Sequence, residues 1–256
     1  MNNFYIEAFS IYVALIILIY AFFLLKKTTA VLDTCWSLGH WLIGSWLLSH
    51  NPNPTIYNFI VYVALSLWAF RLSLYIYFTR VYDLKHIEQR YDELFKQHGQ
   101  SSNTQFLKQI TLQVTLIYIL MAPFYISLLA PLNLNLMTVS LCTLIFLFGW
   151  VNEARTDWQR HVFRKSNKGI LQEGWWRLSR HPNYFFEIVM WCAFTGYVIA
   201  KPYGYLTVIS PALLVLLMLK VTIPVTEEYA LKKNKTAYKK YQQTTSKLIP
   251  LPLRRN

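Results

Sequence analysis

Residues 174–188 read GWWRLSRHPNYFFEI and join a polar cluster to the start of a hydrophobic run. A proline disfavours the helical conformation in the residue before it. His181-Pro182 therefore indicates a helix start, with Pro182 in the first helical position. The N-terminus of a helix offers free backbone N–H groups and the positive end of the helix dipole. With Arg177 and Arg180 beside it, this corner suits a phosphate.

The same stretch carries a polar pair into the hydrophobic run. Asn183 and Glu187 are four residues apart and share one face of the expected helix. A carboxylate one turn inside an apolar helix is costly unless it has a partner or a function. The stretch also fits a cytosolic loop whose arginines follow membrane topology, with Glu187 in a structural ion pair. Spacing alone leaves both interpretations open.

The composition indicates a membrane protein. Of 256 residues, 55% are hydrophobic and 17% aromatic, more than is usual for a soluble domain. The three cysteines lie far apart in apolar runs without a CxxC pair, which argues against a disulfide framework or a zinc site. The six histidines lack HxxxH and HExxH spacing, so we expect no catalytic metal. The absence of GxGxxG, P-loop and GxSxG motifs argues against a soluble nucleotide-binding fold.

Seven apolar segments are each near the roughly 20 residues that cross a bilayer. They predict an all-α integral membrane protein with about seven transmembrane helices. Most of the 25 Lys and Arg residues lie in alternate connections and in the tail. Excess Lys and Arg marks the cytosolic side, so we expect the N-terminus outside and the C-terminus in the cytosol. This distribution explains the net charge of +13 without a nucleic-acid partner. The segments are approximately 4–25, 31–49, 56–78, 106–130, 135–151, 184–200 and 204–221.

Polar residues lie near the cytosolic ends of the second and third segments. Asp33 and His40 lie on one face of the second, and Arg71 and Tyr75 on one face of the third. Arg71 is roughly 10 Å from the end of its segment at 1.5 Å per residue. A charge at that depth normally has a partner, and Asp33 is the natural candidate. The pair could simply lock two helices together, or Asp33, His40 and Tyr75 could donate a proton or polarise a carbonyl.

A second set of charges follows the fifth segment. Glu153, Asp157, Arg160 and Arg164 are spaced by 4, 3 and 4 residues along one helical face. Such spacing often marks no more than a solvated face. Glu153 comes directly after the apolar run, however. An acidic pair there could bind ribose hydroxyls or an amide, and Arg164 could reach a phosphate. The basic tail, residues 232–247, suits anionic lipid headgroups.

Together these pieces resemble the steroid 5-alpha-reductase superfamily, and most closely its bacterial-type branch, the DUF1295 group. The order and spacing of the pieces carry the resemblance, which covers nearly the whole chain from Asp33 to Pro252. Similar RHPNY motifs occur in sterol C14 reductases and isoprenylcysteine methyltransferases. The matching pieces are DTCWSLG (33–39), LWAFRLSLYIYFTR (67–80), RYDEL (90–94), NEARTDWQRHVF (152–163), GWWRLSRHPNYFFEI (174–188) and YKKYQQTTSKLIPLP (238–252).

The resemblance implies one seven-helix domain over residues 1–256 that binds NADPH in a cytosol-facing cavity. Its cofactor-binding part would be roughly residues 152–256. The resemblance places the cofactor against the acidic residues after the fifth segment and the Asn-Glu pair that opens the sixth. Carried onto this chain, the cofactor-binding residues are Glu153, Asp157, Arg164, Asn183 and Glu187, with Arg177, Arg180, His181 and Tyr184 near the phosphates. Arg71 joins this set, because Arg71 and Tyr75 match the family's polar face on the third segment.

Two positions depart from the steroid reductases, which use a Gln-Glu pair on the second span and a tyrosine on the third. Here the second segment offers Asp33 and His40, and Trp68 stands where that tyrosine is expected. The resemblance therefore predicts an NADPH-dependent membrane reductase that transfers a hydride to a polarised C=C bond of a lipophilic, steroid-, sterol- or isoprenoid-like substrate. Asp33, His40 or Tyr75 would be the catalytic acid.

Two alternatives remain. One is an isoprenylcysteine-type methyltransferase that uses S-adenosylmethionine at the His181-Pro182 corner. The other is a non-enzymatic lipid-binding membrane protein on the same scaffold. In each case we expect a multi-pass protein in contact with membrane lipid. It would lie in the inner membrane of a bacterium or in the endoplasmic reticulum of a eukaryote.

Overall fold

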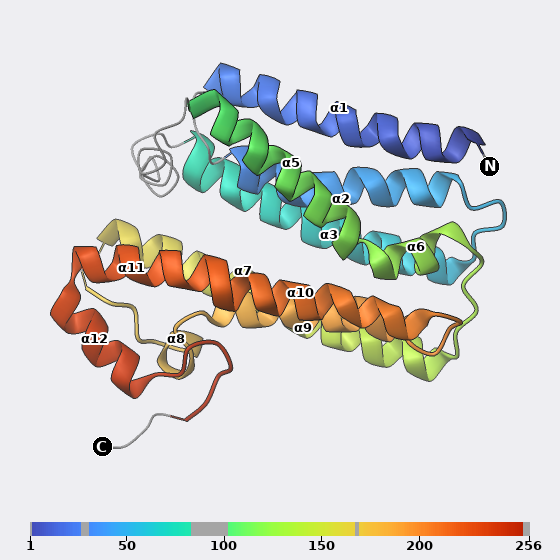
Figure 1. The fold of residues 1–256 in the computed structure, drawn as a ribbon. Coiled ribbons are helices and arrows are strands. Elements are labelled where there is room, and N and C mark those ends of the chain that lie inside the picture. Colours follow the sequence, from blue (N-terminus) through green and yellow to red (C-terminus); the bar gives the residue numbers. More distant parts are fainter. Residues whose placement is uncertain (1, 27–30, 83–101, 167–168, 253–256) are drawn as a thin grey trace. The chain divides into compact units, whose positions relative to one another are not determined.

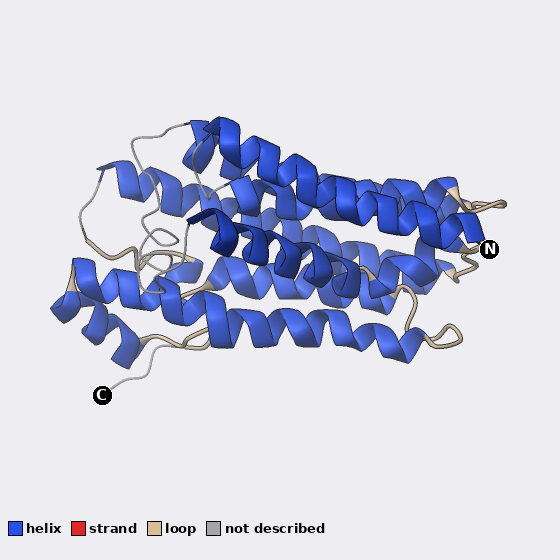
Figure 2. Ribbon diagram, turned by 45° about the horizontal axis from the view of Figure 1, so that its top comes forward, coloured by secondary structure: helices blue, strands red, loops and turns tan. Residues whose placement is uncertain are grey.

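The structure, a computed structural model, describes residues 2–26, 31–82, 102–166 and 169–252. These residues form helices and loops, and no strand is drawn among them (Figure 2). Their one β-type contact is an isolated parallel bridge between Ser179 and Ser246. The chain divides into two compact units, Met1–Asn133 and Leu134–Asn256. The expected cofactor-binding part, residues 152–256, falls inside the second unit, while the single domain over 1–256 stays a prediction. The RYDEL piece (90–94) lies outside the described residues.

The first unit is a set of packed helices. Within it α2 packs along α3, and α1 packs against both α2 and α5 (Figure 1). Its core consists of fully buried apolar side chains such as Leu47, Leu65 and Phe124. Its elements are α1 (Asn2–Lys26), α2 (Val31–Ser49), α3 (Ile56–Ile76), the π-helical turn η1 (Tyr77–Tyr82), α5 (Ser102–Leu120) and α6 (Ala122–Leu129).

The predicted fourth span, residues 106–130, is a broken helix. The chain bends by 51° between Phe106–Leu120 and Ala122–Leu129. Met121 caps α6, and Pro123 lies in the first turn of that helix. Proline has no backbone N–H, and its ring clashes with the carbonyl four residues earlier. Pro123 therefore accounts for the bend at this position.

The second unit is organised around α7 (Leu136–Ser166) and α9 (Pro182–Gly196), which pack side by side. A Cβ on Gly149 would lie 2.7 Å from Cγ of Met190 and 3.0 Å from the carbonyl oxygen of Phe186. Only glycine therefore allows this close approach of the two backbones. The other elements are α8 (Trp175–Leu178), η3 (Gly204–Val208), α10 (Ile209–Leu217), η4 (Met218–Thr222), α11 (Ile223–Lys233) and α12 (Lys235–Thr244).

The predicted helix start at the HPN sequence is confirmed, with His181 as the N-cap of α9 and Pro182 as its first residue. The predicted number of seven membrane spans is not confirmed. Among the described residues, four segments are long and apolar enough to cross a bilayer, or five if the bent pair counts as one span. The four are Ile6–Leu25, Ile56–Tyr82, Leu136–Lys165 and Gly204–Lys233. Helix α9 has 15 residues, about 22 Å, and is shorter than the roughly 30 Å of a hydrocarbon core.

Candidate functional site

Buried polar side chains gather around the N-terminus of α9 in the second unit. They come from α7, from the residues that precede and open α9, from α11 and from α12. Such a concentration is unusual, because charged side chains are rarely buried unless they are paired. We call these side chains, together with the half-buried Gln242, the corner cluster: Glu153, Asp157, Arg180, His181, Asn183, Glu227 and Gln242.

One bond of the cluster joins α9 to α7. Asn183 Nδ2 donates to Asp157 Oδ1 at 3.2 Å. Helix α7 continues well beyond its apolar part, so Glu153 and Asp157 lie one turn apart, and both are buried. Because a carboxylate only accepts, the NH₂ end of Asn183 must face Asp157. Asn183 Oδ1 is then a buried acceptor, and it has no hydrogen-bond partner within the described part of the chain.

Glu227 on α11 is the acid that holds the cluster together. Its Oε1 accepts from Arg180 Nε at 2.7 Å and lies 3.2 Å from His181 Nε2. Its Oε2 accepts from Gln242 Nε2 of α12 at 2.8 Å. A buried carboxylate is tolerated only when it is paired and hydrogen-bonded in this way. Glu227 is not among the site residues predicted from the sequence. A carboxylate close after an apolar segment, the argument used for Glu153, would also have selected Glu227.

Arg180 ties the cluster to the C-terminal segment. Its Nη1 donates to the carbonyl oxygens of Gln242, at 3.1 Å, and Thr245, at 2.6 Å. Its backbone N–H donates to the carbonyl of Ser246 at 2.9 Å. Two of its side-chain nitrogens therefore serve internal bonds. Its expected place near a phosphate stays a prediction, which would rely on the remaining Nη2.

His181 presents one nitrogen to Glu227 and stacks on Tyr184, with ring centroids 5.3 Å apart and planes 2° apart. Burial lowers the pKa of His181. The hydrogen bond to Glu227 opposes this shift, whereas the charges of Arg160 and Arg180 reinforce it. The ring is therefore neutral near pH 7. Its Nδ1 has no hydrogen-bond partner among the residues that the structure describes.

Residues 19–245 match the family described as "Protein of unknown function (DUF1295)". The chain belongs to this family. The match runs from α1 to just beyond α12 and includes every residue of the corner cluster. Comparison with curated proteins and with solved structures gave no match. The DUF1295 assignment from sequence is confirmed, and the wider superfamily remains a matter for proposal.

The other predicted cofactor residues of this DUF1295 protein belong to α7, α8 and α9 of the second unit, except Arg71. Arg164 at the end of α7 and Arg177 in α8 are exposed. Tyr184 and Glu187 on α9 are half-buried, as is Arg71, which belongs to α3 of the first unit. A guanidinium group is a planar cation whose donors suit a phosphate or a carboxylate.

The candidate acids belong to the first unit. Asp33 forms a 3.0 Å ion pair with Arg80 in η1, a partner that the sequence did not single out. The expected pair between Asp33 and Arg71 stays a prediction. His40 is buried, and its Nδ1 lies 2.8 Å from the carbonyl oxygen of Trp36. A carbonyl only accepts, so Nδ1 carries the proton, and a neutral His40 keeps a lone pair at Nε2. Tyr75 carries a donor hydroxyl at neutral pH, which makes it the simplest acid of the three.

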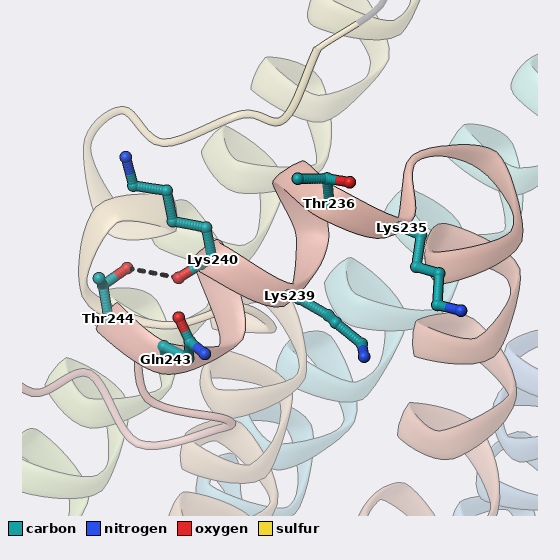
Figure 3. Close-up of a pocket in the computed structure, with 6 residues that line it drawn as sticks. All are labelled: Lys235, Thr236, Lys239, Lys240, Gln243 and Thr244. Carbon is teal, nitrogen blue, oxygen red and sulfur yellow. Dashed lines mark hydrogen bonds between the residues drawn. The ribbon is translucent and has the colours of Figure 1, made fainter.

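Helix α12 has two different faces. Tyr238 and Tyr241 are buried, and the Tyr241 hydroxyl donates to the carbonyls of Trp176 and Ser179. The opposite face borders a shallow, open hollow, which Figure 3 shows with Lys235 and Lys239 extending from the same side. This basic face fits the expected attraction of the tail to anionic headgroups, which stays a prediction. The lining residues are Lys235, Thr236, Lys239, Lys240, Gln243 and Thr244.

Proposed function

We propose that this DUF1295 protein is an NADPH-dependent membrane reductase of the steroid 5-alpha-reductase superfamily. Its substrate would be a lipophilic steroid-, sterol- or isoprenoid-like molecule with a polarised C=C bond. The observation that carries the proposal is the corner cluster, a buried polar site at a helix N-terminus whose acceptors are incompletely bonded within the described chain. Buried polar groups are normally hydrogen-bonded, so unsatisfied acceptors favour a place for a donor-bearing ligand.

The residues fit a dinucleotide in two respects. A dinucleotide has ribose hydroxyls and a carboxamide, whose donors suit His181 Nδ1 and Asn183 Oδ1. It also has phosphates, for which the exposed guanidinium groups of Arg164 and Arg177 are suitable partners. When bound, NADPH supplies a hydride. The remaining contacts of the proposal are Glu153, Asp157, Arg180, Tyr184 and Glu187.

The residues of this chain would polarise the substrate. Addition of a hydride to the β-carbon of an enone moves negative charge to the carbonyl oxygen, and a positioned hydrogen-bond donor stabilises that charge. The α-carbon then takes a proton, so that a hydride and a proton together saturate the bond. We assign the donor to Tyr75, because the hydrogen bond from His40 to Trp36 leaves a neutral His40 as an acceptor at Nε2. Asp33 would help position the substrate.

The setting proposed for this reaction is a seven-span membrane protein. Two observations support it: helices occupy all seven predicted segments, and most of the basic residues lie in alternate connections and in the tail. The N-terminus would then lie outside and the C-terminus in the cytosol. The membrane would be the inner membrane of a bacterium or the endoplasmic reticulum of a eukaryote. The lipophilic substrate would enter from the bilayer.

One observation favours a second candidate, an isoprenylcysteine-type methyltransferase. The corner cluster holds three acids, Glu153, Asp157 and Glu227, against one arginine, Arg180. S-adenosylmethionine carries an ammonium group, a sulfonium charge and ribose hydroxyls, all of which suit buried acceptors. It has no phosphate, however, and so gives the exposed Arg164 and Arg177 no role.

Titration of the purified, detergent-solubilised protein separates these candidates. Thermal stability and intrinsic fluorescence are measured with NADPH, NADH and S-adenosylmethionine. A ligand at 100 times its Kd stabilises the folded state by about 2.7 kcal/mol, which a melting curve resolves. We expect stabilisation by NADPH at lower concentration than by NADH. Stabilisation by S-adenosylmethionine alone would move the assignment to methyl transfer, and no response to any of the three would refute both.

A further inference from the structure

We infer that Glu227 fixes His181 as a hydrogen-bond acceptor, so that this part of the corner cluster receives an uncharged donor group, a hydroxyl or a primary amide, rather than a phosphate. The inference deepens the proposed function and rests on it only for the identity of the whole ligand. The tautomer of His181 and the class of group that it accepts are argued from this chain alone.

The first step concerns the proton on His181. Glu227 Oε1 is a carboxylate oxygen that accepts from Arg180 Nε at 2.7 Å, and it lies 3.2 Å from His181 Nε2. A carboxylate has no proton to give, so Nε2 must be the protonated nitrogen. The His181 side chain is only 2% exposed, and Arg180 lies in the same cluster. A second proton on the ring is therefore disfavoured, and Nδ1 keeps its lone pair.

The second step concerns the neighbouring acceptor. Asn183 gives its NH₂ end to Asp157, so its Oδ1 is the end left over. His181 Nδ1 and Asn183 Oδ1 thus belong to residues two positions apart at the start of α9, and each is more than nine-tenths buried. Within the described residues neither atom has a hydrogen-bond partner. A buried acceptor without a hydrogen bond is unfavourable, and a ligand that donates to it would remove that cost.

The third step concerns charge. Phosphate oxygens are acceptors, so they would face the lone pairs of His181 and Asn183. Glu153 and Asp157, both buried on α7, are carboxylates and therefore further acceptors of the cluster. Two arginines act on His181: Arg160, whose Cζ lies 5.5 Å from the centroid of the Trp176 ring, and Arg180, which already pairs with Glu227 and with two carbonyl oxygens. The dipole of α9 favours an anion only weakly and does not turn these acceptors into donors. Any phosphate would therefore lie elsewhere, at the exposed Arg164 or Arg177.

Nitrogen NMR of the full-length protein in micelles, labelled with ¹⁵N-histidine, tests the tautomer directly. The signal of His181 is assigned by its loss in His181→Gln. We expect a protonated Nε2 and a bare Nδ1 at pH 7. If the parent protein carries a proton on Nδ1, alone or together with one on Nε2, the inference is overturned. In Glu227→Gln the new amide can donate to Nε2, so the tautomer should shift. The matched control is Glu228→Gln, an exposed neighbour paired with Lys232, which should leave the His181 signal unchanged.

Ligand fragments test the class of group that the site accepts. Reduced nicotinamide riboside is uncharged and carries hydroxyls and a carboxamide, whereas inorganic pyrophosphate carries only phosphates. At millimolar concentration we expect the riboside, and not pyrophosphate, to move the Nδ1 signal. A response to pyrophosphate, or none to the riboside, would overturn the inference. NADPH binding without any change at His181 would refute this inference alone, and a riboside response without NADPH binding would refute the proposed function alone.

Discussion

Replacement of Arg180 by methionine removes the cation of the corner cluster while keeping much of its apolar volume. Arg180 donates to Glu227, Gln242 and Thr245 and is only 7% exposed in its side chain. Its loss leaves the Glu227 carboxylate, 10% exposed, without its charged partner and removes a donor from the carbonyls of Gln242 and Thr245. Breaking a buried ion pair from one side costs about 3–5 kcal/mol. Solvent screening reduces this little, because both groups are buried. We therefore expect Arg180→Met to lower the free energy of unfolding by about 4 kcal/mol.

The magnitude can be checked by a double-mutant cycle. Glu227→Met alone should also be severe, because it leaves Arg180 buried without its acceptor. The double variant removes both charges together, and we expect it to cost about 2–3 kcal/mol less than the sum of the single changes. Unfolding by SDS in mixed micelles, followed by the fluorescence of the nine tryptophans, gives the free energies. The control is Arg177→Met, an exposed position three residues away, expected within about 0.5 kcal/mol of the parent protein. Equal effects at 180 and 177, or strictly additive single changes, would refute the reasoning.

Three further predictions follow from the packing and the charges. Gly149→Val should lower the free energy of unfolding by about 1–3 kcal/mol in the same SDS assay, because the valine side chain would meet the backbone of Phe186. The control, Gly169→Val at a glycine with open surroundings, should have little effect. The stability of the protein should fall as the pH drops below about 6.5, because the pKa of His181 is lower in the folded than in the unfolded state and the unfolded chain binds the extra proton. His181→Gln should flatten a profile of stability measured between pH 5 and 8, and a profile unchanged by that variant would contradict the neutral ring. Asp33→Asn and Arg80→Gln should each lower the free energy of unfolding by about 1–2 kcal/mol, because each breaks the same partly buried ion pair. A decrease in only one of the two variants would show that this ion pair does not stabilise the helices.

What could be predicted from the sequence was local. The start of α9 at Pro182 follows from the conformational limits of proline, which act within two residues. The burial of Glu153 and Asp157 on one face of α7 agrees with helical periodicity, although periodicity did not say that the face is buried rather than solvated. The proline at the bend, Pro123, was also visible in the sequence, but the sequence did not show that the helix bends there. The bend was not predicted, because proline inside an apolar segment is compatible with a continuous membrane helix.

What could not be predicted depends on contacts between residues far apart in the chain. Glu227 and Arg180 are 47 positions apart, and no short-range pattern connects them. The hydrogen bond from Arg180 to the carbonyl of Thr245 joins residues that are 65 positions apart. The partner of Asp33 was missed because α3 continues into a π-helical turn, Tyr77–Tyr82, which breaks the 3.6-residue periodicity that assigns residues to faces.

The most direct test of the account is the affinity of the purified protein for NADPH, compared between the parent chain and Asn183→Ala. The control is Gln243→Ala, an exposed amide on α12 outside the corner cluster. The account predicts that the parent and Gln243→Ala bind NADPH equally well and that Asn183→Ala binds at least about 100-fold more weakly, a loss of roughly 2.7 kcal/mol. Equal affinity in Asn183→Ala and the parent, or no binding of NADPH to the parent, would contradict it.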